Sequence, residues 1–511
     1  MRNFQQARWD EPIIMEMGSE GERGVLMPLA EDRVTDAVGS AQSLIPAAMR
    51  RKNAPKLPQM SQMQVLRHFL RLSQETIGTD INIDIGLGTC TMKYSPKVHE
   101  QFVRSPKMSE LHPLQDESTV QGILQILYET DNYLQEISGM DKFSLQPSGG
   151  TQAIYGNVAV IRAYHKANGE DYRDEIITTI LSHPGNAAAA STAGYKVITI
   201  YPDKDGYPDI EALRAAVGPK TAGLLITNPE DTGIYNFRIK EFVNLVHSVG
   251  GLCSYDQANV NGVFGLARAK EAGFDMCHFN LHKSFSSPHG CQGPAAGAQG
   301  VVAKLAPFLA TPTVEFDGEK YYLQDNGEQS IGKLRKFWGV PQVILRTYAY
   351  IRSLGPEGMK KIAELSILNN NYLLKKMLEI EGIELPLAPG KRRLEQARLS
   401  WNKLYEQTGV GTDDIDRRIV DYGFQCFFAS HHPRLIPEPF TPEPVETYSK
   451  ADIDEFVAAF ASIADEARHN PELVKNAPYK AALATQIDGE GLTDPKRFAT
   501  TWRAFKKYVD K

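Results

Sequence analysis

The sequence predicts an α/β protein with a mostly parallel sheet, because short apolar segments alternate with amphipathic helices between about residues 118 and 350. Four segments have the composition of buried strands and are bounded by Gly, Pro, Asp or Asn: 175–181, 196–202, 222–228 and 250–256. Between the last two, Phe242, Leu245 and Val246 recur on one helical face. This alternation predicts a sheet that helices cover on both sides.

The chain of 511 residues is long enough for two or three domains. We expect an N-terminal arm over residues 1–90, a large domain over 91–354 that carries the sheet, and a smaller α+β domain over 355–511. The smaller domain contains a well-marked helix, because Ser449 and Asp452 stand at capping-box spacing before an apolar stripe. We interpret the Pro-rich stretch PEPFTPEPVE before that helix as a connector.

Composition argues against several kinds of partner. The net charge is −6 and the sequence pI is about 6.1, so we expect no surface for nucleic acid or for an anionic membrane. No apolar segment approaches the ~20 residues of a spanning helix, and the N-terminus lacks the apolar core of a signal peptide. The five cysteines form no CxxC pair, which is typical of free thiols in a reducing compartment. We therefore expect a cytoplasmic protein without a metal site.

The candidate chemistry centres on Lys283, in the stretch MCHFNLHKSFSSPHG. Histidines and small hydroxyl residues surround this lysine, and no acid stands close to it in the sequence. A lysine that attacks an aldehyde must lose its proton near neutral pH, which burial and neighbouring positive charge promote. The alternative is a lysine that pairs with a carboxylate distant in the sequence.

Asp256 and His183 each follow or end a predicted strand. A carboxylate such as Asp256, at the carboxyl end of a parallel strand, can keep a pyridine nitrogen protonated. His183 stands before a run of small residues, so its imidazole can lie over a planar ring. Taken singly, the plainer interpretations are a helix-capping acid and a histidine satisfied within the fold.

The stretch QPSGGTQAIYGN leads from a loop into a helix. Gly149 and Gly150 let the backbone approach an anion, which Ser148, Thr151 and the helix N–H groups can then bind. The alternative is a plain turn, and a Walker loop is excluded because no GK[ST] follows.

A phosphate loop, a stacking histidine, a ring-nitrogen acid and an imine-forming lysine follow one another along the chain. We expect that order in the large domain of a fold-type I pyridoxal-phosphate enzyme, of the aspartate aminotransferase type.

Longer motifs resemble those of a known family. NLHKSFSSPHG resembles its lysine motif and GLGTCTMKYSPKVHE its GSCTMKYNPK segment. LHPLQDESTVQGILQILYE, SGMDKFSLQPSGGTQA, ITNPEDTGIY and SYDQANVNG match in order and spacing. On these motifs the chain resembles the glycine decarboxylase P-protein of the glycine cleavage system, in the form whose C-terminal half is a separate subunit, subunit 2. The resemblance covers most of residues 10–380 and returns near 415–475.

The resemblance implies a site and a reaction. Lys283 would hold pyridoxal 5'-phosphate, Asp256 would pair with its ring nitrogen, and His183 would stack on the ring. The residues implied near the phosphate are Gly149, Gly150, Thr151 and Ser284, and those near the reacting carbon are His282 and His289. Such an enzyme decarboxylates glycine and transfers the aminomethyl group to a lipoyl arm on the H-protein. Its subunit 2 works with a homologous subunit 1 in an α2β2 assembly, so we expect a hetero- or homo-oligomer.

The sequence departs from the family's motifs near the expected site. It has HPGNAA for HGTNPA after Ser182, HGCQGPA for HGGGGPG at residues 289–295, and a charged segment near 390–415 where the family has one containing HEF. Two alternatives therefore stay open. One is a pyridoxal-phosphate decarboxylase, lyase or aminotransferase-like enzyme for another amino acid. The other is a non-catalytic scaffold subunit, against which the retention of Lys283 and Asp256 argues.

Overall fold

The computed structural model describes residues 4–25, 27–53, 55, 57–88, 90–91, 93–289 and 295–482. The described residues form two compact units: those between Gly78 and Asn476 make up the larger, and residues 4–77 with 477–482 belong to the smaller. The smaller unit contains α1 (Asp32–Val38) and α2 (Gln62–Gln74). All the residues predicted for the site lie in the larger unit.

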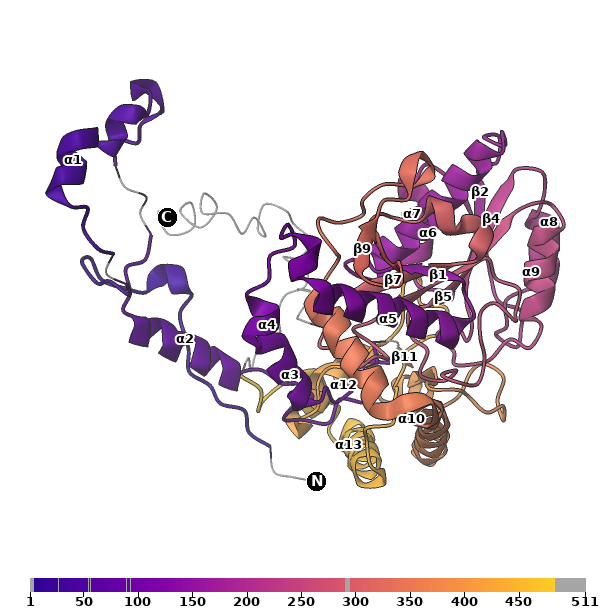
Figure 1. Cartoon of the computed structure of the whole chain (residues 1–511). Helices are drawn as coiled ribbons and strands as arrows, with labels where there is room; N and C mark the ends of the chain where they lie inside the picture. Colours follow the sequence, from indigo (N-terminus) through magenta and orange to yellow (C-terminus); the bar gives the residue numbers. More distant parts are fainter. Residues whose placement is uncertain are drawn as a thin grey trace. The chain divides into compact units, whose positions relative to one another are not determined.

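A seven-stranded sheet is the centre of the larger unit (Figure 1). Its strands stand in the order β1-β7-β6-β5-β4-β2-β3. Their bounds are β1 (Lys142–Ser144), β2 (Glu175–Thr179), β3 (Lys196–Ile200), β4 (Thr221–Thr227), β5 (Leu252–Gln257), β6 (Met276–Asn280) and β7 (Gly297–Val301). Strands β2 to β6 pair in parallel, whereas β7 is antiparallel to both β1 and β6. The four predicted strands are β2, β3, β4 and β5, so the prediction of a mostly parallel sheet is confirmed.

Helices and two short two-stranded sheets complete the larger unit. The helices are α3 (Lys97–Arg104), α4 (Pro106–Ser109), α5 (Gln121–Ser138), α6 (Gly150–Ala167), α7 (Gly185–Thr192), α8 (Ile210–Ala216), α9 (Ile239–His247), α10 (Pro341–Met377), α11 (Asn402–Thr408), α12 (Thr412–Ile419), α13 (Lys450–His469) and α14 (Pro471–Lys475). One of these sheets is the hairpin of β8 (Thr313–Phe316) and β9 (Tyr321–Gln324), and the other pairs β10 (Leu399–Ser400) with β11 (Pro439–Phe440). In the described part of the chain, none of the helices combines the length and the apolar character that crossing a bilayer requires.

The sheet has an apolar core on each face. In β4, Leu224 and Ile226 belong to one cluster of buried residues, and Leu225 between them belongs to another, as the alternation of side chains along a strand requires. Phe242 of α9 packs in the first cluster, and Ile154 of α6 packs in the second. Helices therefore cover both faces, as the sequence predicts.

A third core joins the second half of α10 to the C-terminal helices. The predicted capping box begins α13, because Asp452 N donates to Ser449 Oγ (3.2 Å) and Ser449 N donates to Asp452 Oδ2 (2.8 Å). Phe456 and Phe460 of α13 then pack in this core, where Phe460 stacks on Trp401. The apolar stripe of this helix is thus core packing.

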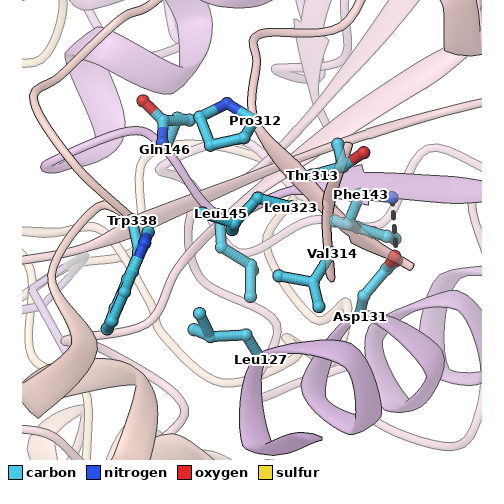
Figure 2. Close-up of a pocket in the computed structure, with 10 residues that line it drawn as sticks. All are labelled: Leu127, Asp131, Phe143, Leu145, Gln146, Pro312, Thr313, Val314, Leu323 and Trp338. Atoms are coloured by element: carbon cyan, nitrogen blue, oxygen red, sulfur yellow. Dashed lines mark hydrogen bonds between the residues drawn. The ribbon is translucent and has the colours of Figure 1, made fainter. Parts of the chain in front are cut away.

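Figure 2 shows a small cavity between α5, β1 and the β8–β9 hairpin. Its volume of about 20 Å³ is room for a single water molecule, so it cannot admit a substrate. On its wall, Phe143 N donates to Asp131 Oδ1 (2.9 Å), and Lys142 Nζ lies 2.9 Å from Asp131 Oδ2. These contacts hold β1 against α5.

Candidate active site

The residues predicted for the site gather where the parallel strands end. Asp256 lies at the carboxyl end of β5, Lys283 follows β6, and His183 follows β2. Gly149 and Gly150 begin α6, which packs on β6 and β7. The charges of Asp256 and Lys283 both act on the His183 imidazole. The structure therefore brings the lysine, the acid and the histidine together at the edge where α/β proteins bind ligands.

Asp256 is a buried carboxylate with a full set of partners. Asn186 Nδ2 donates to its Oδ2 (2.9 Å), and Ala258 N donates to its Oδ1 (3.1 Å). Burial alone would raise the pKa of this carboxyl, but His278 and His183, together with these hydrogen bonds, hold the pKa of Asp256 below its ordinary value. The group is ionised at neutral pH and can pair with a protonated nitrogen.

His183 is a neutral imidazole beside that carboxylate. Gly185 N donates to His183 Nδ1 (2.9 Å), which places the proton of the ring on Nε2. Burial lowers the pKa of His183, against the opposing charge of Asp256, and the charge of Lys283 lowers it further. The ring meets His431 edge to face at a centroid distance of 4.9 Å.

His282 and His289 flank Lys283 in the sequence and contact each other in space. Their rings meet edge to face at 5.1 Å. Burial, and then the charge of Lys283, lowers the pKa of His282 to about 4. Burial, His282 and Lys283 together lower the pKa of His289 to about 3. Both imidazoles are uncharged at neutral pH, and among the described residues the buried Nε2 of His289 has no hydrogen-bond partner.

The glycine loop is shaped by the residue that ends β6. A Cβ on Gly150 would lie 2.5 Å from Asn280 Oδ1, so only glycine allows this close approach. Gly149 is the N-cap of α6 and makes no side-chain cap, which leaves the first N–H groups of the helix for another acceptor. Thr151, in the first turn, is exposed. Ser148 is engaged elsewhere, because its hydroxyl donates to Gln152 Oε1 (2.9 Å).

Ser284 was expected near the phosphate, but its hydroxyl has partners within the protein. It donates to Asn259 Oδ1 (3.1 Å) and accepts from Val260 N (2.9 Å). The side chain is fully buried. Cys291 and Gln292, where the sequence departs from the family's glycines, lie outside the described residues.

Several residues of the site escaped the sequence analysis. His278 pairs with Asp256 in the register of β5 and β6, and its Nε2 lies 3.3 Å from Asp256 Oδ1. Only that register, which one sequence does not give, makes the two residues neighbours. His431 comes from a distant segment without any local signal, whereas Asn186 stands in the quoted motif HPGNAA and could have been noticed there.

Comparison with known proteins defines first the class of the fold. Residues 147–397 match the family described as Aminotransferase class-V, and residues 362–480 match the one described as Glycine dehydrogenase, C-terminal domain. A crystal structure of glycine decarboxylase (P-protein) of the glycine cleavage system, in inhibitor-bound form, is similar, with a TM-score of 0.72 and 18% identity over 86% of this chain and all of that one. A NIFS-like protein gives a TM-score of 0.56 with 13% identity over 75% of this chain and 99% of that one. The fold is that of the class-V aminotransferases, as predicted.

Relatives then show the particular family. A protein of Thermococcus gammatolerans is 40% identical over 511 residues, and one of Pyrococcus furiosus is 40% identical over 512, each match covering 99% of both chains. One of Saccharolobus islandicus is 37% identical over 504 residues, 98% of this chain and 97% of that protein. All three are named "Probable glycine dehydrogenase (decarboxylating) subunit 2". The chain belongs to this glycine dehydrogenase subunit 2 family, so the predicted resemblance is confirmed.

Proposed function

We propose that the chain is the cofactor-binding subunit of a glycine decarboxylase, which removes CO₂ from glycine and passes the aminomethyl group to a lipoyl carrier protein. The observation that carries the proposal is the buried, ionised Asp256 at the sheet edge beside His183 and Lys283. Membership of the glycine dehydrogenase subunit 2 family supports glycine as the substrate. A scaffold subunit would have no need of an ionised carboxylate in this dry position.

The residues of the site fit pyridoxal 5'-phosphate. An acid that keeps a ring nitrogen protonated must itself stay ionised while buried, which the partners of Asp256 achieve. The start of α6 offers N–H groups to a phosphate. Next to them, Gly150 lies so close to the Asn280 side chain that a Cβ would collide with it. Buried Nε2 of His289 and Oδ1 of Asn280 have no partner within the described ranges, so polar atoms of a ligand can satisfy them.

Each residue then has a defined task. Bound pyridoxal phosphate supplies an electron sink for the electron pair that remains when a carboxyl group leaves. Lys283 would carry the cofactor on its Nζ, and Asp256 would hold the proton on the ring nitrogen. His183, neutral and held by Gly185 N, would pack on the ring face. Gly149, Gly150 and Thr151 would bind the phosphate, whereas the Ser284 hydroxyl remains in its hydrogen bonds to Asn259 and Val260.

His282 and His289 would manage protons near the reacting carbon. With pKa values of about 4 and 3, both rings are uncharged at neutral pH. An uncharged imidazole has a nitrogen lone pair that can accept a proton. His282 is oriented for this task, because its Nδ1 lies 3.1 Å from Ala296 O, which leaves Nε2 as the acceptor.

The proposal includes partners. The relatives are named as a subunit 2, which supports a homologous subunit 1 as the partner of this chain. The acceptor of the aminomethyl group would be the lipoylated H-protein. A hetero-oligomer follows from these partners, and the cytoplasmic location stays a prediction from composition.

A second candidate function is action on an amino acid that carries a polar side chain. The segment near 390–415 that departs from the family's motif brings the buried Arg398 close to the site, where its Nη2 donates to Asp231 Oδ2 (3.1 Å). His431 lies between this ion pair and His183, 3.7 Å from Asp231 Oδ2. Glycine has no side chain that would need such charged neighbours.

Exchange of labelled bicarbonate into the carboxyl group of glycine tests the proposal, with the purified chain, subunit 1 and lipoylated carrier present. We expect glycine-dependent exchange that disappears in Lys283→Ala. No exchange, together with a spectral response to an amino acid with a polar side chain, would favour the second candidate. A wild-type chain that binds no pyridoxal phosphate would contradict both.

A further inference from the structure

Ser284, the residue after Lys283, is held from two sides by a buried polar network that the proposed function does not use. Its hydroxyl donates to Asn259 Oδ1 (3.1 Å), and its carbonyl oxygen accepts from Lys93 Nζ (2.9 Å). Ser284 and Lys93 are both buried. Because Ser284 and Lys283 share a peptide bond, whatever fixes one fixes the backbone of the other.

Behind Asn259 stands Glu443, from the Pro-rich stretch before α13. Asn259 Nδ2 donates to Glu443 Oε1 (2.6 Å), Thr91 N donates to Oε2 (3.0 Å), and Thr91 Oγ1 donates to Oε1 (3.2 Å). Each of these three hydrogen bonds places a donor on the Glu443 carboxyl group. Asn259 therefore links Glu443 to Ser284 through two hydrogen bonds.

Behind Lys93 stands Glu446, from the same stretch. Lys93 Nζ lies 2.8 Å from Glu446 Oε1, and the Lys93 side chain is 1% exposed. Tyr350 OH also donates to Glu446 Oε1 (3.0 Å), and Asn261 Nδ2 donates to Oε2 (3.3 Å). Lys93 thus links Glu446 to the carbonyl group of Ser284.

The charges of this network fall into two pairs. Lys93 and Glu446 cancel each other in one buried ion pair. Glu443 is the second acid of the network, and the positive charge of Lys283 acts on it. Burial raises the pKa of Glu443 to about 7, whereas the Asn259 hydrogen bond, Lys283, Thr91 and Lys93 act against that rise. The charge of Glu443 in turn raises the pKa of Glu395 and the pKa of Tyr448.

We propose that Glu443 and Glu446 are positioning residues for the Lys283 loop: Glu446 acts through Lys93, and Glu443 acts through Asn259. This inference rests on the proposed function, because Lys283 matters as the residue that carries the cofactor. The stretch that the sequence suggests is a mere connector would then hold the lysine in place.

The first experiment measures backbone hydrogen exchange over residues 281–288 in the full chain before any cofactor is added. Glu443→Gln keeps the shape of the side chain and removes its charge, so we expect exchange in this loop to become about tenfold faster, with β2 and β4 unchanged. Glu395→Gln is the matched control, since Glu395 is also a buried carboxyl, but within the described residues its side chain makes no hydrogen bond to this network. A wild-type exchange rate in Glu443→Gln would overturn the positioning role. If Glu443→Gln does not fold, Glu446→Gln replaces it, and we expect the same faster exchange in this loop.

The second experiment measures the affinity for added pyridoxal phosphate, from its absorbance near ~420 nm. In Glu443→Gln we expect attachment about tenfold weaker than in the wild type, because the loop that carries Lys283 is no longer held in one conformation. Glu395→Gln should match the wild type. An unchanged affinity in Glu443→Gln would overturn the positioning role. If the wild type attaches no cofactor at all, the proposed function fails, whereas the hydrogen-exchange result still decides the positioning role.

Discussion

Asp256 and His278 face each other across two neighbouring parallel strands, with His278 Nε2 3.3 Å from Asp256 Oδ1 and both side chains buried. The pair stands at the edge of the sheet where His183 and Lys283 also lie. Burial raises the pKa of Asp256, but His278, His183 and the hydrogen bonds to its carboxylate together hold that pKa below its ordinary value. A carboxylate kept ionised in this way can hold a proton on a ring nitrogen.

Replacement of this acid tests its role in the chemistry. We expect Asp256→Asn to lower kcat by about a hundredfold or more, because a neutral amide cannot stabilise the protonated ring nitrogen. Attachment of the cofactor at Lys283 should persist, so absorbance and kinetics are measured on the same sample. A variant with wild-type kcat would show that Asp256 does not face the ring nitrogen.

The close approach at the glycine loop gives a second prediction. Gly150→Ala would place a Cβ 2.5 Å from Asn280 Oδ1, so the start of α6 must shift and retention of pyridoxal phosphate should weaken about tenfold or more. Gly122→Ala is the control, because a Cβ on that helical glycine meets nothing within 4 Å. Equilibrium dialysis against the cofactor distinguishes the two variants. Equal retention by both would mean that the phosphate does not bind at the start of α6.

The fold could be predicted further than the site. The strands β2 to β5 were recognised because each is a continuous apolar segment with breakers at its ends, a signal that lies within a few residues. The sequence indicates Asp256, His183 and Lys283 as candidates for the same reason, since each stands at or after such a segment. His278 needs the register between two strands, and Glu443 approaches Asn259 from a segment 184 positions away along the chain. No pattern within a single sequence carries that information.

His289 should make the protein sensitive to acid. Burial, with His282 and Lys283, lowers its pKa from 6.5 to about 3 in the folded chain, so below pH 6.5 the unfolded chain binds the extra proton first. The stability that the neutral ring contributes to the folded chain is complete above about pH 6.5 and is lost as the pH falls toward 3. His289→Gln should therefore lose less of its free energy of unfolding than the wild type between pH 7 and pH 5. Urea denaturation at the two pH values measures this, and an equal or larger loss in the variant would contradict it.

Glu395 should act in the opposite direction. Burial, and then the charge of Glu443, raises its pKa from 4.5 to about 8. The stability that the protonated carboxyl contributes is complete below pH 4.5 and is lost as the pH rises through 8, because the unfolded chain gives up this proton more readily. Glu395→Gln should thus gain free energy of unfolding over the wild type as the pH rises from 5 to 9, by about 1 kcal/mol or more. A gain that does not depend on pH would show that the carboxyl ionises normally.

The most direct test of the account is the covalent link itself. Purified wild-type chain is incubated with pyridoxal phosphate and reduced with borohydride, and the modified peptide is identified by mass spectrometry. We predict a single cofactor adduct on Lys283 and none on the neighbouring buried Lys93. An adduct on another lysine, or no stable adduct in a correctly folded protein, would contradict the account.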